Sequence, residues 1–155
     1  MSEEVPASPD FGLPITPDPA QESVPFKQFK HEPDLRPGVL VTKVKPGDLW
    51  ASQTWVDPVK IASSVRQIGE LTPEQRTQGL LLPAYWQEIP ATATSAARIR
   101  LVLADRHHRA IVAWDSGIPL NVSLLGALPE KTMVQPLSAL RHAFESKAGL
   151  LDGAF

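Results

Sequence analysis

The sequence feature that most constrains the fold is the basic turn Asp105-Arg106-His107-His108-Arg109. The residues before it, 98–104, alternate like a β-strand, and residues 109–116 are predicted to form a helix that ends at Gly117. In a strand–turn–helix unit, backbone N–H groups and the helix dipole point at an anion bound in the turn. Two imidazoles and a guanidinium add donors for phosphate oxygens. The turn therefore predicts an anion site; the alternative is a solvated basic turn with no ligand.

The composition sets limits on the class of protein. With 155 residues, 43% of them hydrophobic, the chain is long enough for one domain with a real core. The formal net charge of -2 gives no general attraction to nucleic acid. The chain has no cysteine, which excludes a disulfide scaffold, a thiol nucleophile and a cysteine-based zinc site. The sequence shows no secretory signal and no apolar stretch of the roughly 20 residues that span a membrane. We therefore expect a soluble, cytoplasmic protein with no membrane partner.

Proline and acidic residues set the first 37 residues apart from the rest. Eight of the 16 prolines lie there, with seven acidic residues against three basic ones. This composition predicts that residues 1–37 form an extended, partly polyproline arm that is disordered when free, followed by a folded domain over 38–155. The arm's few apolar anchors are expected to dock on the body, on a protein partner or on a sibling subunit; they are Phe11, Leu13, Ile15, Phe26 and Phe29.

The first half of the folded domain has a strand and a well-marked helix. Residues 39–44 read as a strand, followed by a turn at Pro46-Gly47. Asp57-Pro58 is typical of an N-cap followed by proline in the first helical position, and Gly69 marks the helix end. Apolar residues at helical spacing are predicted to face the core; they are Ile61, Val65 and Ile68.

The second half alternates strands and helices. Residues 80–86 are predicted to form a strand whose proline indicates an edge or a bulge. A polar loop at 91–97, the strand at 98–104 and a strand at 119–125 follow. A last helix is predicted to begin at Pro136 and to stop at Gly149; its buried residues are Leu137, Leu140 and Phe144. The fold class that results is α/β (α+β), with short helices packed against a mixed sheet.

The helix at 57–69 has a second, polar face. With the apolar residues inward, the remaining positions at i, i+3, i+4 and i+7 share one side; they are Lys60, Ser63, Ser64 and Gln67. A lysine, two hydroxyls and an amide suit a phosphate chain, although such a face is also typical of a solvated helix surface.

Two motifs together resemble a known family. Trp55-Val56-Asp57-Pro58-Val59-Lys60, then the box Asp105-Arg106-His107-His108-Arg109 and the turn Gly117-Ile118-Pro119-Leu120, are similar to the pattern of the ParB/sulfiredoxin-like superfamily. That pattern is a V/L-D-P-x-K helix followed by a D-G-H-H-R, G-C-H-R or G-E-R-R box at a helix start. The resemblance covers roughly residues 38–145. It implies a small mixed sheet with short helices, preceded here by the Pro-rich arm.

The resemblance also implies a nucleotide site, for ATP or CTP with Mg²⁺. Matched motif positions make Lys60, Ser63, His108 and Arg109 phosphate contacts, with Gln67 where a hydroxyl residue is common. Ser64 and Arg106 join this set from their positions in the sequence. Two departures stand out: His107 replaces the cysteine of sulfiredoxins, which excludes their reductase chemistry, and Arg106 replaces a glycine.

NTP hydrolysis or phosphoryl transfer would further need a carboxylate and a base. Asp105 is the nearest carboxylate to the box, with Glu70 and Glu74 after the first helix; alternatively, Asp105 caps the amides of 107–109. His107 is a candidate general base or transient phosphate acceptor. No residues at standard ligand spacing indicate a structural metal site.

Two further functions stay open. A ParB-like nuclease or DNA-binding accessory factor would use a local basic patch, made of Arg98, Arg100, Arg106 and Arg109 with the two histidines. A non-catalytic structural or interaction protein would use its N-terminal arm. Trp50 and Trp55 flank the start of the first helix, where they either pack or stack on a nucleotide base.

Overall fold

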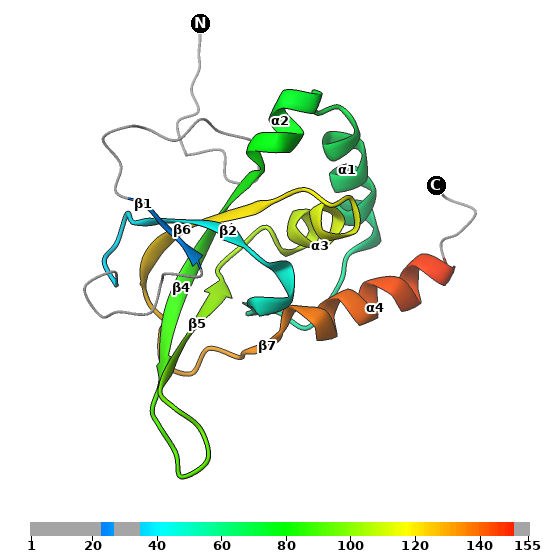
Figure 1. The fold of residues 1–155 in the computed structure, drawn as a ribbon. Helices are drawn as coiled ribbons and strands as arrows, with labels where there is room; N and C mark the ends of the chain where they lie inside the picture. The colour runs from blue at the N-terminus through cyan, green and yellow to red at the C-terminus, as the bar shows by residue number, and fades with distance from the viewer. Residues whose placement is uncertain (1–22, 27–34, 151–155) are drawn as a thin grey trace, which may run out of the picture.

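Seven strands form one mixed sheet in the computed structural model, which describes residues 23–26 and 35–150, without the side chains of 144–150 (Figure 1). The sheet order is β1-β2-β6-β4-β5-β3-β7. The strands are β1 Ser23–Pro25, β2 Leu40–Val44, β3 Leu49–Ala51, β4 Leu80–Ile89, β5 Arg98–Leu103, β6 Leu120–Ala127 and β7 Gln135–Pro136. The helices are α1 Pro58–Gly69, α2 Pro73–Gln78, α3 His107–Asp115 and α4 Leu137–Leu150, with a 3₁₀ turn, η3, at Pro46–Asp48.

Parallel and antiparallel pairs alternate in this sheet, as the predicted mixed α+β class requires. β1–β2, β4–β6 and β3–β5 are parallel, whereas β2–β6, β4–β5 and β3–β7 are antiparallel. The strands predicted at 39–44, 98–104 and 119–125 are confirmed as β2, β5 and β6, and the polar loop at 91–97 joins β4 to β5.

The core lies between the sheet and helices α1, α3 and α4. Alternate strand residues, among them Leu82 and Leu103, pack with Ile61 of α1, Ile111 of α3 and Leu140 of α4. Because side chains alternate across a strand, one sheet face supplies these residues. Among the described helices, none is long and apolar enough to cross a membrane.

Helix α1 begins and ends where the sequence predicts, but it is rotated about its axis. The Asp57 carboxylate accepts the Val59 N–H at 2.9 Å, and Pro58 occupies the first turn. The buried residues are Ile61, Ser64 and Ile68, whereas Val65 is 41% exposed, so its predicted burial is wrong. At about 100° per residue, Ser64 completes the buried stripe. The polar residues therefore border the buried stripe and do not lie opposite it.

Strand β4 decides between the two alternatives predicted for the proline at 80–86, an edge or a bulge: the strand has an irregularity and is not at the sheet edge. It extends to Ile89 and lies inside the sheet, between β6 and β5. Pro83 is tolerated because it lies one residue beyond the last β4–β5 pair, Ala84 with Leu103, so no strand residue of β5 faces its missing N–H. Its carbonyl still accepts the Ala104 N–H at 2.9 Å. The expected irregularity occurs just after it, as a register shift in the β4–β6 pairing.

Sequence reasoning missed helix α2. Thr72 and Gln75 form a reciprocal capping box at its start, and this pattern is readable in the sequence. The helix ends at Gly79, whose φ is +91°. A Cβ at Gly79 would lie 2.5 Å from the Pro119 carbonyl oxygen, so only glycine fits where α2 passes into β4.

The two ends of the described chain differ in part from the expectations. Residues 23–25 form β1 on the edge of the sheet, and Phe26 packs against the core, so this part of the predicted free arm is packed. The other arm anchors lie outside the described residues. Leu137 and Leu140 are buried as predicted, whereas α4 continues to Leu150, one residue past its predicted stop. The Phe144 side chain lies outside the described part.

Candidate functional site

Helix α3 begins two residues earlier than the sequence predicts. Its N-cap is Arg106, with φ 66° and ψ 30°, so His107 and His108 lie in the first helical turn. This left-handed conformation suits glycine, the residue of the resembled pattern, better than arginine. The Asp105 carboxylate accepts the Arg106 N–H at 2.7 Å. The N-cap residue Arg106 makes no side-chain cap bond, and among the described residues the Asp105 carboxylate bonds the Arg106 N–H and not the 107–109 amides that it was considered to cap.

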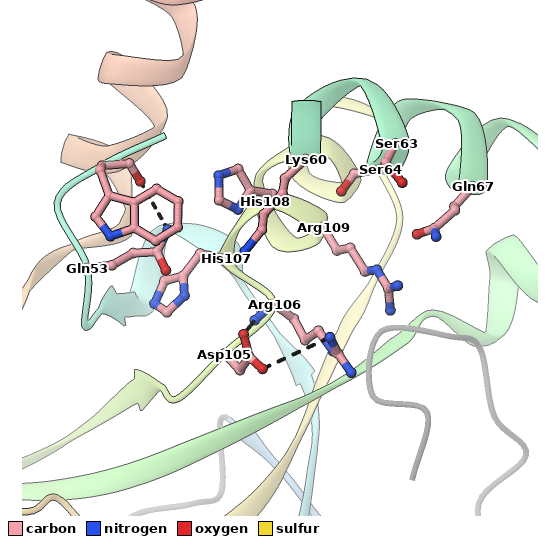
Figure 2. A pocket seen from close by; sticks show the side chains of 11 residues that line it. Gln53, Lys60, Ser63, Ser64, Gln67, Asp105, Arg106, His107, His108 and Arg109 are labelled. Carbon is pink, nitrogen blue, oxygen red and sulfur yellow. Dashed lines mark hydrogen bonds and ion pairs between the residues drawn. The ribbon is translucent and has the colours of Figure 1, made fainter. Parts of the chain in front are cut away.

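The two predicted motifs meet at one pocket of about 310 Å³ between α1 and α3 (Figure 2). The nine candidate phosphate-binding and catalytic residues of helix 57–69 and the 105–109 box all line it, and the other two described lining residues are Gln53 and Trp55. Glu70 and Glu74 are not among the lining residues. The lining residues are Gln53, Trp55, Lys60, Ser63, Ser64, Gln67, Asp105, Arg106, His107, His108 and Arg109.

Helix α1 supplies the hydroxyl and amide side of the pocket. Figure 2 shows Lys60, Ser63, Ser64 and Gln67 along this helix, across from Arg109 of α3. Ser64 is only 4% exposed, yet its hydroxyl makes no hydrogen bond with any described residue. Its oxygen is not among the buried side-chain atoms that lack a partner, so the hydroxyl is a donor and an acceptor open to the pocket.

The pocket is electropositive. Among the described lining residues, three carry a positive charge, Lys60, Arg106 and Arg109, and one carries a carboxylate, Asp105. The Arg106 Nη1 lies 4.0 Å from the Asp105 Oδ2, so part of this charge is offset at an exposed pair. The first turn of α3 adds the positive end of a helix dipole. The pocket therefore favours an anion.

His107 is buried and neutral. It is 2% exposed, and its Nε2 accepts the Ser52 N–H at 3.0 Å. Burial lowers its pKa from 6.5 to about 4, against an opposing effect of the Asp105 charge. The proton of the neutral ring is then on Nδ1, which is buried without a partner in the described residues. Neither ring nitrogen has a free lone pair, so this geometry does not favour His107 as a base or phosphate acceptor.

His108 has a similar arrangement one position further along. Its Nε2 accepts the Asp57 N–H at 2.9 Å, which ties α3 to the N-cap of α1. Burial lowers the pKa of His108, and the nearby Lys60 charge lowers it further, against Asp57 and Asp105. The two histidines therefore supply neutral rings, and the positive charge of the pocket comes from the lysine and the arginines.

Trp55 and Gln53 enter the pocket from the segment between β3 and α1. Trp55 is 52% exposed, and the Lys60 Nζ lies 5.2 Å from the centre of its ring. Sequence reasoning considered Trp55 for stacking but missed Gln53, for which no local signal exists. Trp50, the other tryptophan considered, does not line the pocket; the Arg100 guanidinium stacks on it at 3.8 Å.

The predicted basic patch for nucleic acid is divided. Arg106 and Arg109 line the pocket, whereas Arg98 begins β5 at the end next to the β4–β5 loop. The five steps from Arg98 to Leu103 span roughly 17 Å of strand. Arg100, between them, is taken up by its contact with Trp50. The arginines therefore do not form one continuous surface.

Within the described part of the chain, no group of three His, Cys, Asp or Glu residues could hold a metal ion. Comparison of the chain with protein-family models, curated proteins and solved structures gives no match. The ParB/sulfiredoxin-like resemblance therefore stays a prediction, and the chemistry of the pocket has to be argued from its geometry.

Proposed function

We propose that the α1–α3 pocket binds the phosphate groups of a nucleotide, ATP or CTP. One observation carries the proposal: the Ser64 hydroxyl, which has no hydrogen-bond partner among the described residues, lines the same pocket as Lys60 and the uncapped first turn of α3. A hydroxyl that faces helix N–H groups across a cavity is completed by a ligand with several acceptor atoms. A phosphate supplies them.

The remaining lining residues fit the same ligand. Lys60 and Arg109 bring positive charge from two helices, and Ser63 and Gln67 add neutral donors beside Ser64. A volume of about 310 Å³ is at the lower end of small-molecule pockets. The order and spacing of the two motifs, which resemble the ParB/sulfiredoxin-like pattern, also support a nucleotide.

The proposal covers binding and not turnover. Mg²⁺ that accompanies a nucleoside triphosphate is held largely by phosphate oxygens and water, so the pocket needs no dedicated metal cage. Hydrolysis or phosphoryl transfer would need a positioned base, and both His107 and His108 use Nε2 to accept a backbone N–H. The donors and charges of the pocket serve to hold an anion.

Titration calorimetry of the full chain with ATP and with CTP, each with and without Mg²⁺, tests the proposal. Arg109→Ala removes a cation that lines the pocket, and we expect a loss of affinity of roughly tenfold or more, the usual worth of a charge-assisted hydrogen bond. Arg98→Ala, at the far end of β5, is the matched control and should leave the affinity unchanged. If Arg109→Ala folds normally and binds like the wild type, the pocket is not the binding site.

A further inference from the structure

The segment that joins β3 to α1, residues 52–57, is fastened to helix α3 at both ends. At one end the Ser52 N–H donates to His107 Nε2 at 3.0 Å, and at the other the Asp57 N–H donates to His108 Nε2 at 2.9 Å. Two adjacent, buried rings of one helical turn thus hold both ends of a six-residue segment. Both Nε2 atoms are used in these backbone hydrogen bonds, and a catalytic role would not explain them.

Further hydrogen bonds fix the inside of the segment. The Ser52 hydroxyl donates to the Leu103 carbonyl at 2.7 Å, which ties the segment to the end of β5. The Gln53 side chain donates to the Trp55 carbonyl at 3.0 Å, and Gln135 of β7 donates to the Gln53 carbonyl at 2.8 Å. The backbone around Trp55 is therefore held from three sides, by α3, β5 and β7.

This well-held segment presents a large aromatic ring to solvent. Trp55 is 52% exposed on the pocket wall, while its neighbour Val56 is buried in the core. The His108 ring lies 5.6 Å from the Trp55 ring at an angle of 50°, and so supports it from the α3 side. An indole held in this way loses little conformational entropy when a flat ligand stacks on it.

Lys60 connects the indole to the anion side of the pocket. Its Nζ lies 5.2 Å from the Trp55 ring centre, and the same side chain lines the pocket with Ser63 and Ser64. A ligand whose phosphate lies near Lys60 therefore has Trp55 within reach of whatever the phosphate is attached to. A bare polyphosphate has nothing to place there, whereas a nucleoside phosphate has a flat ring.

We propose that Trp55 is the stacking surface that makes this pocket select phosphates carrying a flat heterocycle over bare polyphosphate, and that His107 and His108 are the residues that position it. This inference rests on the proposed phosphate site. It assigns the histidine pair to building the pocket wall, through backbone hydrogen bonds.

Calorimetry with ATP, CTP and inorganic tripolyphosphate measures the contribution of the ring. We expect the wild type to bind ATP or CTP more tightly than tripolyphosphate. Trp55→Ala should weaken nucleotide binding roughly tenfold or more and leave tripolyphosphate binding unchanged, since stacking on an aromatic side chain is lost. Trp55→Phe should keep most of the preference. Val59→Ala is the control, because Val59 is 75% exposed and does not line the pocket.

The positioning role has its own readout, which is the ratio of the tripolyphosphate and nucleotide dissociation constants. His108→Leu removes the acceptor for the Asp57 N–H, so the ratio should fall toward that of Trp55→Ala. His108→Gln places an amide oxygen near the position of Nε2 and should restore the ratio. If His108→Leu does not fold, the Trp55 variants still test the stacking role and His108→Gln still tests the positioning role.

The outcomes separate the two proposals. Binding of neither nucleotide nor tripolyphosphate refutes the phosphate site itself. Equal binding of both by the wild type, or equal weakening of both by Trp55→Ala, overturns the stacking role while the phosphate site stands. A ratio that is lost in His108→Gln overturns the positioning role.

Discussion

The Ser64 hydroxyl gives the sharpest test of the site, because its removal should move stability and binding in opposite directions. Ser64→Ala deletes one oxygen from the pocket face of α1. In the protein without ligand, this oxygen has no hydrogen-bond partner among the described residues, so nothing that stabilises the fold is lost. With phosphate bound, the hydroxyl becomes a donor to a charged acceptor, and Ser64→Ala loses this hydrogen bond completely.

The two effects differ in size as well as in sign. Alanine is a better helix former than serine by about 0.5 kcal/mol, and a hydroxyl open to water contributes little to the fold. We therefore expect the free energy of unfolding to rise by about 0.5 kcal/mol, and Tm by about 1–2 °C. A hydrogen bond to a charged group contributes about 1.5–3 kcal/mol, so nucleotide affinity should fall roughly tenfold or more.

Urea unfolding and calorimetry with ATP measure the two quantities on the same protein. Val59→Ala is again the matched control, because it makes the same change to alanine on an exposed face of α1. It should raise stability slightly through helix propensity and leave affinity unchanged. A Ser64→Ala protein that is less stable than the wild type by 1 kcal/mol or more would refute the reasoning, since the hydroxyl would then have a structural partner. Unchanged nucleotide affinity would remove Ser64 from the site.

Two further predictions concern the stability of the fold that holds the pocket. The folded pKa of His107, about 4, lies below its ordinary value of 6.5, so the unfolded chain binds more protons between these pH values. The free energy of unfolding is therefore unaffected by His107 protonation above about pH 6.5. As the pH falls toward 4, it decreases by up to about 3 kcal/mol. His107→Gln should flatten this part of a urea-unfolding pH profile, and an unchanged slope would contradict the assignment. Gly79→Ala should lower the free energy of unfolding by about 2 kcal/mol or more, because its Cβ meets the Pro119 carbonyl oxygen at a φ of +91°. Gly69→Ala, with open space around its Cβ, should not; equal effects of the two changes would show that the contact is not what matters.

Structural features that depend only on residues close together in the sequence were predictable. The Asp57-Pro58 pair marked the start of α1 because an N-cap and a first-turn proline act within three residues of the chain. The capping box of α2, formed by Thr72 and Gln75, is a signal of the same kind, because it also acts within three residues of the chain. Pro83 was correctly associated with an irregularity but wrongly with a sheet edge, since the length of β5 decides what faces it.

The start of α3 shows where such signals fail. No capping side chain marks it, and Arg106 begins the helix from a left-handed conformation that arginine rarely adopts. The sequence therefore suggested a longer turn and two accessible histidines. Their burial, and the lowered pKa values that follow from it, result from packing against residues more than 50 positions earlier in the chain.

The sequence by itself determined most of the residues that meet at the pocket. Lys60, Ser64 and Arg109 were singled out from two short motifs, and the fold brings both motifs to one cavity. Only the tertiary structure decided what each residue does there. The rotation of α1 buries Ser64 and exposes Val65, because one helix face must fit against α3 and a pattern of apolar residues does not fix that angle to within one residue. Hydrogen-bond partners follow from the same packing. For this reason His107 and His108 accept backbone N–H groups of residues 52–57, which are distant in the sequence.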